Sequence, residues 1–125
     1  MKKIISILLL IFFLCSCSHE QKEDIYILFT NDVEGQMNNG VSYAGVKAFK
    51  DRYEAEHSYV ALVDIGDFFD GDVGLYDGGA SVVSVMNAVG YDVVALGNQE
   101  FSIGLDALAR DIAASDFSNV SCNLK

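Results

Sequence analysis

The chain has 125 residues, with 8 Lys or Arg against 18 Asp or Glu, which gives a formal net charge of −10. About half of the residues (51%) are apolar, and this fraction excludes an intrinsically disordered chain. The acidic balance argues against a nucleic-acid-binding protein, because such proteins need clustered Lys and Arg to neutralise phosphates. The length allows at most one domain.

An apolar run near the amino terminus predicts a secretory signal. Residues 1–3 carry two lysines, and residues 4–14 are apolar except for Ser6. At about 1.5 Å per residue, this run reaches only about 16 Å, roughly half of a hydrocarbon core. A signal peptide is therefore favoured over a membrane-spanning helix.

The stretch Leu14-Cys15-Ser16-Cys17 resembles the bacterial lipobox, in which the last cysteine is acylated and becomes the first residue. This resemblance implies a lipoprotein signal peptide over residues 1–16, lipid attachment at Cys17, and a tether over residues 17–23. It also implies an exported protein that is anchored by lipid to a membrane of the bacterial cell envelope. Without the resemblance, the same run reads as an ordinary cleaved signal. Cys122 then has no internal disulfide partner, and we expect it to be a small buried apolar residue.

Four near-continuous apolar runs rich in β-forming residues predict strands that are buried on both faces. The runs cover residues 24–30, 59–64, 92–96 and 119–123. Apolar residues at helical spacing lie between them, at Val46, Phe49 and Tyr53, at Val82, Val85, Met86 and Val89, and at Leu105, Leu108, Ala109 and Ile112. Strand and helix thus alternate, which predicts an α/β fold with a parallel sheet.

Acidic and amide side chains follow three of these strands, at the point where each strand ends. Asp32 and Glu34 follow the first strand, Asp67 follows the second, and Asn98, in the run Gly97-Asn98-Gln99-Glu100, follows the third. Ligands of open α/β sheets bind beyond the carboxyl ends of the strands, so these side chains should converge if the three strands are neighbours. Two like charges about 4 Å apart repel by roughly 4 kcal/mol at an effective dielectric of 20. Three carboxylates there would require a cation, a raised pKa or an open site.

Each acidic residue also has a plainer interpretation. Asn31-Asp32, Asp70-Gly71 and Asp77-Gly78 are ordinary turn sequences, and an Asp after a strand often caps the following helix. Their occurrence at three successive strand ends favours a site over separate turns. Residues 64–77 do not have the alternating spacing or the closing Glu of an EF-hand loop, which argues against calcium binding of that type. His57 lies in a polar stretch and is expected to be solvated.

Four stretches, in order along the chain, resemble the motifs of one enzyme family. Residues 27–35 (ILFTNDVEG) are similar to the opening motif ILHTND-x-HG of the 5′-nucleotidase and UDP-sugar hydrolase family of calcineurin-like metallophosphoesterases. Residues 42–50 (SYAGVKAFK), 63–71 (VDIGDFFDG) and 94–104 (VALGNQEFSIG) are similar to that family's next blocks, at similar spacing. The resemblance implies a four-layered α/β/β/α sandwich, hydrolysis of phosphoesters such as nucleotides, and two divalent metal ions (Mn, Mg, Ca or Zn).

By this resemblance, Asp32 stands at a first-metal ligand, Asp67 at the carboxylate that bridges both metals, and Asn98 at the amide ligand of the second metal. Two positions depart from the family pattern. Glu34 replaces the first His ligand, which shifts the metal preference from zinc toward manganese, magnesium or calcium. Gln99 replaces the His that assists at the transition state. Its amide can donate a hydrogen bond but cannot transfer a proton, and losing that transfer costs about 10² to 10⁴ in rate.

The resemblance covers residues 24–125, which correspond to the opening part of the family's catalytic domain. Later family motifs that supply three more His ligands, and the separate nucleoside-recognising domain, have no counterpart in the sequence. We therefore expect the N-terminal part of a metallophosphoesterase domain, which a downstream chain would complete. By itself it should be weak or inactive, and partly unfolded, aggregated or held by a partner. The alternative is a non-catalytic exported lipoprotein that binds a cation or a partner.

Overall fold

The computed structural model describes residues 23–35, 40–69 and 76–122, and the structural statements below concern these residues. Their strands are β1 (Tyr26–Thr30), β2 (Val60–Asp64), β3 (Val93–Ala95) and β4 (Ser118–Val120). Neighbouring strands are parallel, and their order in the sheet follows the chain, β1-β2-β3-β4. The predicted parallel sheet is confirmed.

The strands of the described part are connected by α2 (Tyr43–Glu56), α4 (Ala80–Val89), the short 3-10 helix η1 (Gln99–Phe101) and α5 (Leu105–Ala114). Helix α2 begins after Ser42, whose hydroxyl accepts a hydrogen bond from the Gly45 N–H (3.4 Å). Helix α4 ends at Gly90, which adopts a left-handed conformation (φ 84°) that closes the last turn. The predicted alternation of strands and helices, and hence the α/β class, is confirmed.

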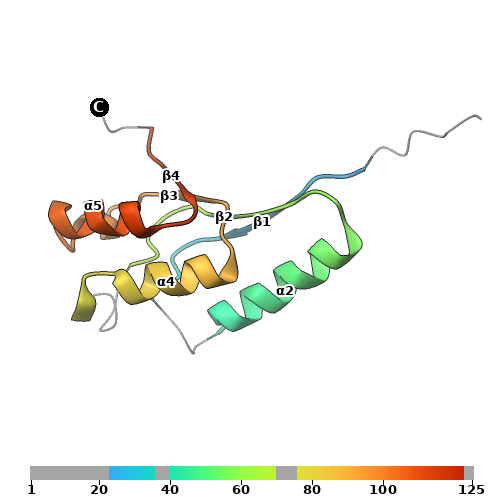
Figure 1. The fold of residues 1–125 in the computed structure, drawn as a ribbon, viewed down its shortest axis with the longest axis horizontal. Coiled ribbons are helices and arrows are strands. Elements are labelled where there is room, and N and C mark those ends of the chain that lie inside the picture. Colours follow the sequence, from blue (N-terminus) through green and yellow to red (C-terminus); the bar gives the residue numbers. More distant parts are fainter. Residues whose placement is uncertain (1–22, 36–39, 70–75, 123–125) are drawn as a thin grey trace, which may run out of the picture.

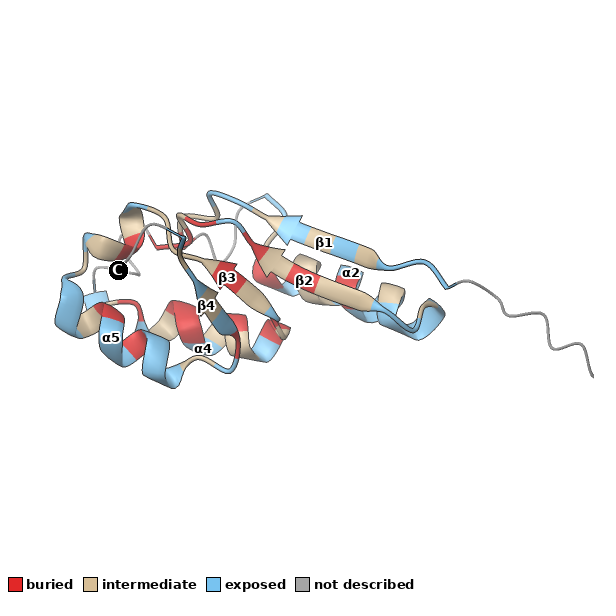
Figure 2. Ribbon diagram, turned by 90° about the horizontal axis from the view of Figure 1, so that it is seen from above, coloured by how far each residue is buried: buried red, intermediate tan, exposed pale blue. Residues whose placement is uncertain are grey.

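All three α-helices lie on one side of the sheet. Figure 1 shows α2 and α4 below the strands and α5 beside β3 and β4, and Figure 2 shows β1 and β2 in front of α2. This arrangement follows from the strand order, because successive right-handed crossovers in one direction place every connecting helix on the same face. Helix α4 contacts both α2 and α5, so the helices form one layer. The described residues thus supply one sheet and one helical layer of the sandwich that the resemblance implies.

The hydrophobic core lies between the sheet and the helical layer. Its buried apolar residues are Tyr43, Leu62, Phe68, Phe69, Val82, Val83, Met86, Val89, Tyr91, Val94, Leu108 and Phe117. Burial of one Val, Leu, Phe or Met side chain contributes about 1.5 to 3 kcal/mol to stability. Packing on this face of the sheet is therefore the main source of stability in the described part.

The opposite side of the sheet, which we call the open face, is also apolar. Side chains alternate along each strand, so the residues between the core positions point away from the helices. The strand register aligns these residues across the sheet as Ile27, Phe29, Ala61, Val63, Val93, Ala95, Ser118 and Val120. In β1, Ile27 is 64% exposed and Phe29 is 69% exposed. The expectation that the strands are buried on both faces is therefore wrong for β1, because no described element covers this face.

Two helices bury charged residues beside apolar residues that the spacing selected, of which Val46 packs against the core and Leu108 is buried. In α2, Phe49 is 42% exposed, and the buried residues are Tyr43 and Lys50. The Lys50 ammonium reaches the Gly90 carbonyl oxygen and lies 3.3 Å from the Asp92 carboxylate. A lysine can occupy an inward position because its apolar stem packs while its charged end finds acceptors.

In α5 the buried residues are Leu108 and Asp111, whereas Leu105 is exposed. The Asp111 Oδ1 atom lies 3.4 Å from the guanidinium of the neighbouring Arg110. Burial, which outweighs the nearby Arg110 charge, raises the pKa of Asp111. Apolar spacing alone cannot detect an inward position that is occupied by a charged residue.

Cys122 and His57 also differ from expectation. Cys122 is an exposed free thiol, because it follows the edge strand β4 rather than a central strand. His57 is half-buried, and its ring stacks on Tyr26 with centroids 3.9 Å apart. Placement of the helix end beside the start of β1 provides this aromatic contact.

The predicted signal peptide (residues 1–16), the lipid attachment at Cys17 and almost all of the tether (residues 17–23) fall outside the described residues. Within the ranges that the structure describes, no helix is long and apolar enough to cross a membrane.

Candidate functional site

The loops after β1 and β2 lie side by side beyond the carboxyl ends of these strands. The Asp32 N–H donates to the Gly66 carbonyl oxygen (3.2 Å), and the Glu34 N–H donates to the Asp67 carbonyl oxygen (3.3 Å). The two loops therefore extend the strand pairing into irregular backbone. This pairing places the Asp32 and Glu34 backbones against the segment that carries Asp67.

Asp32, Glu34 and Asp67 adopt left-handed backbone conformations, with φ values of 51°, 51° and 58°. No other non-glycine residue in the described part has a positive φ. Such conformations cost about 1 to 3 kcal/mol and persist where the surrounding structure enforces them. Asp tolerates this region better than most residues, whereas Glu has no such advantage. The backbone is therefore specialised at the same three acidic residues that the sequence analysis selected.

The loop after β3 closes on the same segment. The Gln99 N–H donates to Asp67 Oδ1 over 3.0 Å. A Cβ atom at position 97 would overlap with that same carboxylate oxygen, so only Gly97 leaves room for it. The carboxyl ends of β1, β2 and β3 are thus joined around Asp67, as expected from three neighbouring parallel strands.

Glu100 joins the second and third loops, and the sequence analysis did not select it. Its side chain is 0% exposed. Its carboxylate accepts the N–H groups of Asp67 (3.1 Å), Phe69 (3.0 Å) and Gly97 (2.7 Å). Glu100 lies within residues 94–104, which resemble a family block, but spacing gave no sign of partners about 30 residues upstream.

A second buried polar group lies under the ends of β1 and β2. The Thr30 hydroxyl donates to Asp64 Oδ2 (2.5 Å) and lies 3.0 Å from the Tyr91 hydroxyl, while the Gly66 N–H donates to Asp64 Oδ1 (2.9 Å). Burial is the main cause that raises the pKa of Asp64 to about 6, and these hydrogen bonds partly oppose it. Burial also raises the pKa of Tyr91 to about 12. This network anchors the strand ends from which the site loops leave.

A cavity of about 680 Å³ opens between the free edge of β1 and the start of α2. Its lining includes Leu28, Val41, Val46, Phe49, Asn31, Asp32 and Tyr43. The Tyr43 hydroxyl is buried and has no hydrogen-bond partner within the described part, and burial raises its pKa. The cavity therefore borders Asp32 with a mainly apolar wall.

The plainer interpretation holds for Asp77. The Asp77 carboxylate accepts the Ser81 N–H (2.9 Å) and the Ser81 hydroxyl, which places it at the first turn of α4. These bonds hold the pKa of Asp77 below its usual value. Asp77 therefore belongs to the turn before α4, as its sequence indicated, and its carboxylate holds Ser81 in the first turn of that helix.

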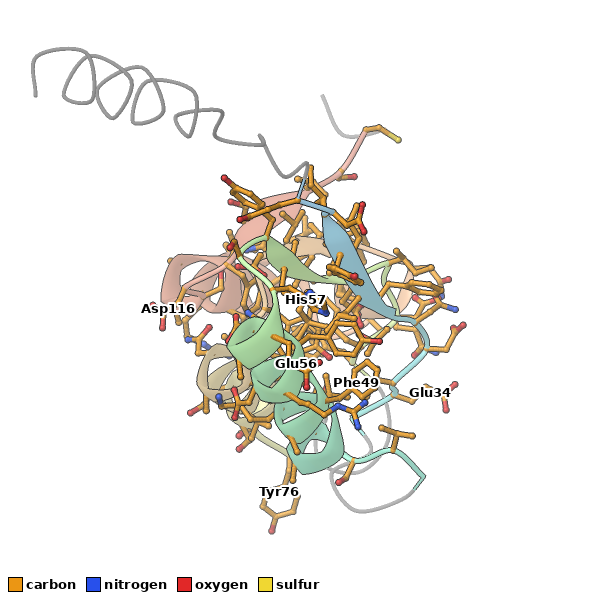
Figure 3. The ribbon with its side chains drawn as sticks, turned by 90° about the vertical axis from the view of Figure 1, so that its right-hand side faces the viewer. Glu34, Phe49, Glu56, His57, Tyr76 and Asp116 are labelled. Atoms are coloured by element: carbon orange, nitrogen blue, oxygen red, sulfur yellow. The ribbon has the colours of Figure 1, made fainter. Side chains whose placement is uncertain are left out.

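The four predicted metal ligands lie at the same edge of the sheet but are unequally exposed. Asp32 and Asn98 are exposed, whereas Glu34 and Asp67 are half-buried. Glu34 lies at the outer margin of the molecule in Figure 3. The Asp32 carboxylate accepts a hydrogen bond from the Asn31 side chain. The roles of these four residues as metal ligands stay predictions.

The oxygen ligands at this edge are of the type that hard divalent cations prefer, but too few of the described side chains come together there. Asp32 and Asp67 offer carboxylate oxygens, which magnesium, manganese and calcium prefer. Among the residues that the structure describes, however, no three His, Cys, Asp or Glu side chains come close enough to hold a metal ion. As described, this edge can supply part of a coordination shell, and a tightly held ion would need further ligands.

Curated relatives with similar sequences are 5′-nucleotidases. The chain is 36% identical over 117 residues to a snake venom 5′-nucleotidase of Gloydius brevicauda, an alignment that covers 82% of this chain and 20% of that protein. It is 31% identical over 121 residues to the 5′-nucleotidase of Bos taurus, covering 82% of this chain and 21% of that protein. No sequence profile of a protein family matches the chain.

The fold agrees with the sequence similarity. The 5′-nucleotidase precursor from Thermus thermophilus superposes with a TM-score of 0.71 at 26% identity, over 79% of this chain and 22% of that one. The chain belongs to the 5′-nucleotidase family of calcineurin-like metallophosphoesterases. The NAD nucleotidase of Haemophilus influenzae shares the fold, with a TM-score of 0.73 at 21% identity, over 79% of this chain and 20% of that one. This member of the 5′-nucleotidase family spans about one fifth of the length of the curated relatives cited above.

Proposed function

We propose that this chain supplies the first part of the metal-binding edge of a nucleotide phosphoester hydrolase, and that it is weak or inactive by itself. The observation that carries the proposal is the joining of three loops around Asp67 at the carboxyl edge of the sheet. The similarity to 5′-nucleotidases supports nucleotides as the substrate class.

Asp32, Glu34, Asp67 and Asn98 would supply oxygen ligands to divalent cations, which in such sites activate a water and stabilise the leaving oxygen. Asp67 is the best positioned of these, since the Gln99 N–H holds its Oδ1 atom and no described residue donates a hydrogen bond to its Oδ2 atom. The Gln99 side chain would donate a hydrogen bond to a phosphoryl oxygen, without proton transfer. Low activity follows from this substitution.

The open face supports completion by further polypeptide. Seven of its eight residues are apolar, and Ile27 and Phe29 are largely exposed. Uncovered apolar surface of this kind marks a region that packs against another element. We propose that a downstream segment, or a separate chain, covers this face and brings the missing metal ligands.

Calorimetric titration of Mn²⁺ into the full chain and into Asp67→Asn tests the metal-binding part of this proposal. We expect weak binding by the unchanged chain and loss of binding in the variant, because Asp67 stands at the predicted bridging position. Glu56→Gln removes one exposed negative charge from α2 and serves as the control, with binding retained. A folded chain that takes up no cation, or equal uptake by Asp67→Asn, would contradict the proposal.

A non-catalytic role is the second candidate, and Gln99 is the residue that favours it. An exported lipoprotein could keep the loop framework to bind a cation or a partner while hydrolysing nothing. Manganese uptake without phosphate release, in a preparation whose open face is covered by its partner, would identify this role.

We further propose that the protein is exported and attached to a membrane of the bacterial cell envelope through acylated Cys17. The support is the lipobox-like stretch that ends at this residue. A radioactive fatty acid should label the unchanged protein and not Cys17→Ser. Labelling of both proteins, or of neither, would refute the anchor.

A further inference from the structure

We propose that Glu100 is a positioning residue that holds the Asp67 carboxylate at the carboxyl edge of the sheet. The role of that carboxylate as a metal ligand rests on the function proposed above. The hydrogen bonds of Glu100 do not depend on that function. Glu100 itself is buried behind the edge and lies outside the set of predicted metal ligands.

The contacts of Glu100 account for its complete burial. A carboxylate in the protein interior is costly unless hydrogen-bond donors surround it. Glu100 Oε2 accepts the Asp67 N–H and the Gly97 N–H, and therefore bridges the loops after β2 and β3. Glu100 Oε1 accepts the Phe69 N–H, two residues further along the first of these loops. All three donors are backbone groups, so the side chain fixes the path of the chain at and after Asp67 and at Gly97 in the neighbouring loop.

This arrangement determines where the Asp67 carboxylate lies. With its N–H fixed on Glu100, Asp67 adopts its left-handed conformation, and its Oδ1 atom accepts the Gln99 N–H. Gly97, whose N–H is also bound by Glu100, leaves the space that this carboxylate occupies. The Gln99 N–H has no bond to Glu100, so it reports on the position of Asp67 rather than on the loss of Glu100 itself.

Glu100→Gln tests the hydrogen bonds of Glu100 without changing the size of the side chain. It preserves size but replaces one acceptor oxygen with an NH₂ group that faces a backbone N–H. We expect amide hydrogen exchange at Gln99 in the ¹⁵N-labelled full chain, held in detergent micelles, to become about tenfold faster. Exchange at Val83 should stay within about twofold of its original rate, because its N–H is held by the Gly79 carbonyl oxygen in the first turn of α4 and not by Glu100. The matched variant Glu56→Gln should change neither amide.

Manganese affinity provides the functional readout. Residues that orient a metal ligand typically affect affinity by about 10- to 100-fold, so Glu100→Gln should weaken Mn²⁺ binding at least about tenfold while Glu56→Gln does not. If the unchanged chain takes up no manganese, the proposed function fails, and the exchange rates alone decide the role of Glu100.

Unchanged exchange at Gln99, or equal acceleration at Gln99 and Val83, would overturn the positioning role. Measurable but unaltered manganese affinity in Glu100→Gln would overturn it as well. Should Glu100→Gln not fold, Glu100→Asp retains the charge one methylene shorter and should accelerate Gln99 exchange severalfold. Loss of folding in both variants would instead assign Glu100 a general role in stability.

Discussion

The two faces of the sheet have similar compositions but different surroundings. Leu28, Leu62 and Val94 point toward the helices and pack in the core, whereas Ile27, Phe29 and Val120 point away and stay exposed. The difference arises because every crossover places its helix on the same side of the sheet. An apolar face without a cover indicates that the described part is one side of a larger core.

The two faces of the sheet also contribute differently to stability and to the candidate site. The helix-covered face supplies the packing that stabilises the sheet, and beneath its strand ends lies the buried group formed by Thr30, Asp64 and Tyr91. The site loops leave from those same strand ends. The loop framework therefore depends on the covered face, while the completion proposed above would involve the open one.

The largest expected effect is a core deletion on the covered face. Leu62→Ala should lower the free energy of unfolding by about 2 to 5 kcal/mol, since it creates a cavity in packed surroundings. Ile27→Ala on the open face should change it by about 0.5 kcal/mol or less, as an exposed side chain loses little. Urea unfolding of both variants at pH 7 measures this contrast. Equal losses would mean that the open face is covered in solution.

The next effect in size concerns pH. Because the pKa of Asp64 is raised from 3.8 to about 6, its protonated form favours the folded state. Its contribution is fully present below about pH 4 and is lost as pH rises through 6. It amounts to about 3 kcal/mol, at about 1.36 kcal/mol for each pKa unit. The difference in unfolding free energy between the unchanged chain and Asp64→Asn should follow this course. Parallel stability curves would contradict it.

The smallest expected change in stability accompanies a change in association. Phe29→Lys on the open face should alter the free energy of unfolding by less than about 0.5 kcal/mol, yet shift the chain from aggregates toward monomer. Phe49→Lys, on an exposed part of α2, is the matched control and should leave association unchanged. Sedimentation velocity distinguishes the two variants. Similar behaviour of both would show that the open face does not drive association.

Much of the fold could be predicted because β-forming runs and helical spacing are local signals. The four strands, the parallel sheet and the inward face of α4 all follow from them. The inward positions of α2 and α5 could not be predicted in the same way, since Lys50 and Asp111 are charged, and Lys50 finds its acceptors at Gly90 and Asp92, about 40 residues away. The exposure of β1 depends on whether another element packs on the open face, and the residues of the strand itself do not indicate this.

The candidate site was partly predictable for a related reason. Asp32, Asp67 and Asn98 stand directly after strands, so topology alone places them at one edge of the sheet. Glu100 follows the same strand as Asn98, but its role could not be predicted this way, because that role arises from backbone N–H groups of a loop distant in sequence. Asp64 ends its strand on the covered face, and its raised pKa depends on burial that appears only after folding.

Phosphate release from a 5′-nucleotide in the presence of Mn²⁺, by the full chain and by Asp67→Asn, tests the central claim most directly. We expect no release by the unchanged chain above that of the variant, because the described residues bring too few of the predicted metal ligands together and do not cover the open face. A soluble monomer that melts cooperatively, releases phosphate and loses this activity in Asp67→Asn would contradict it.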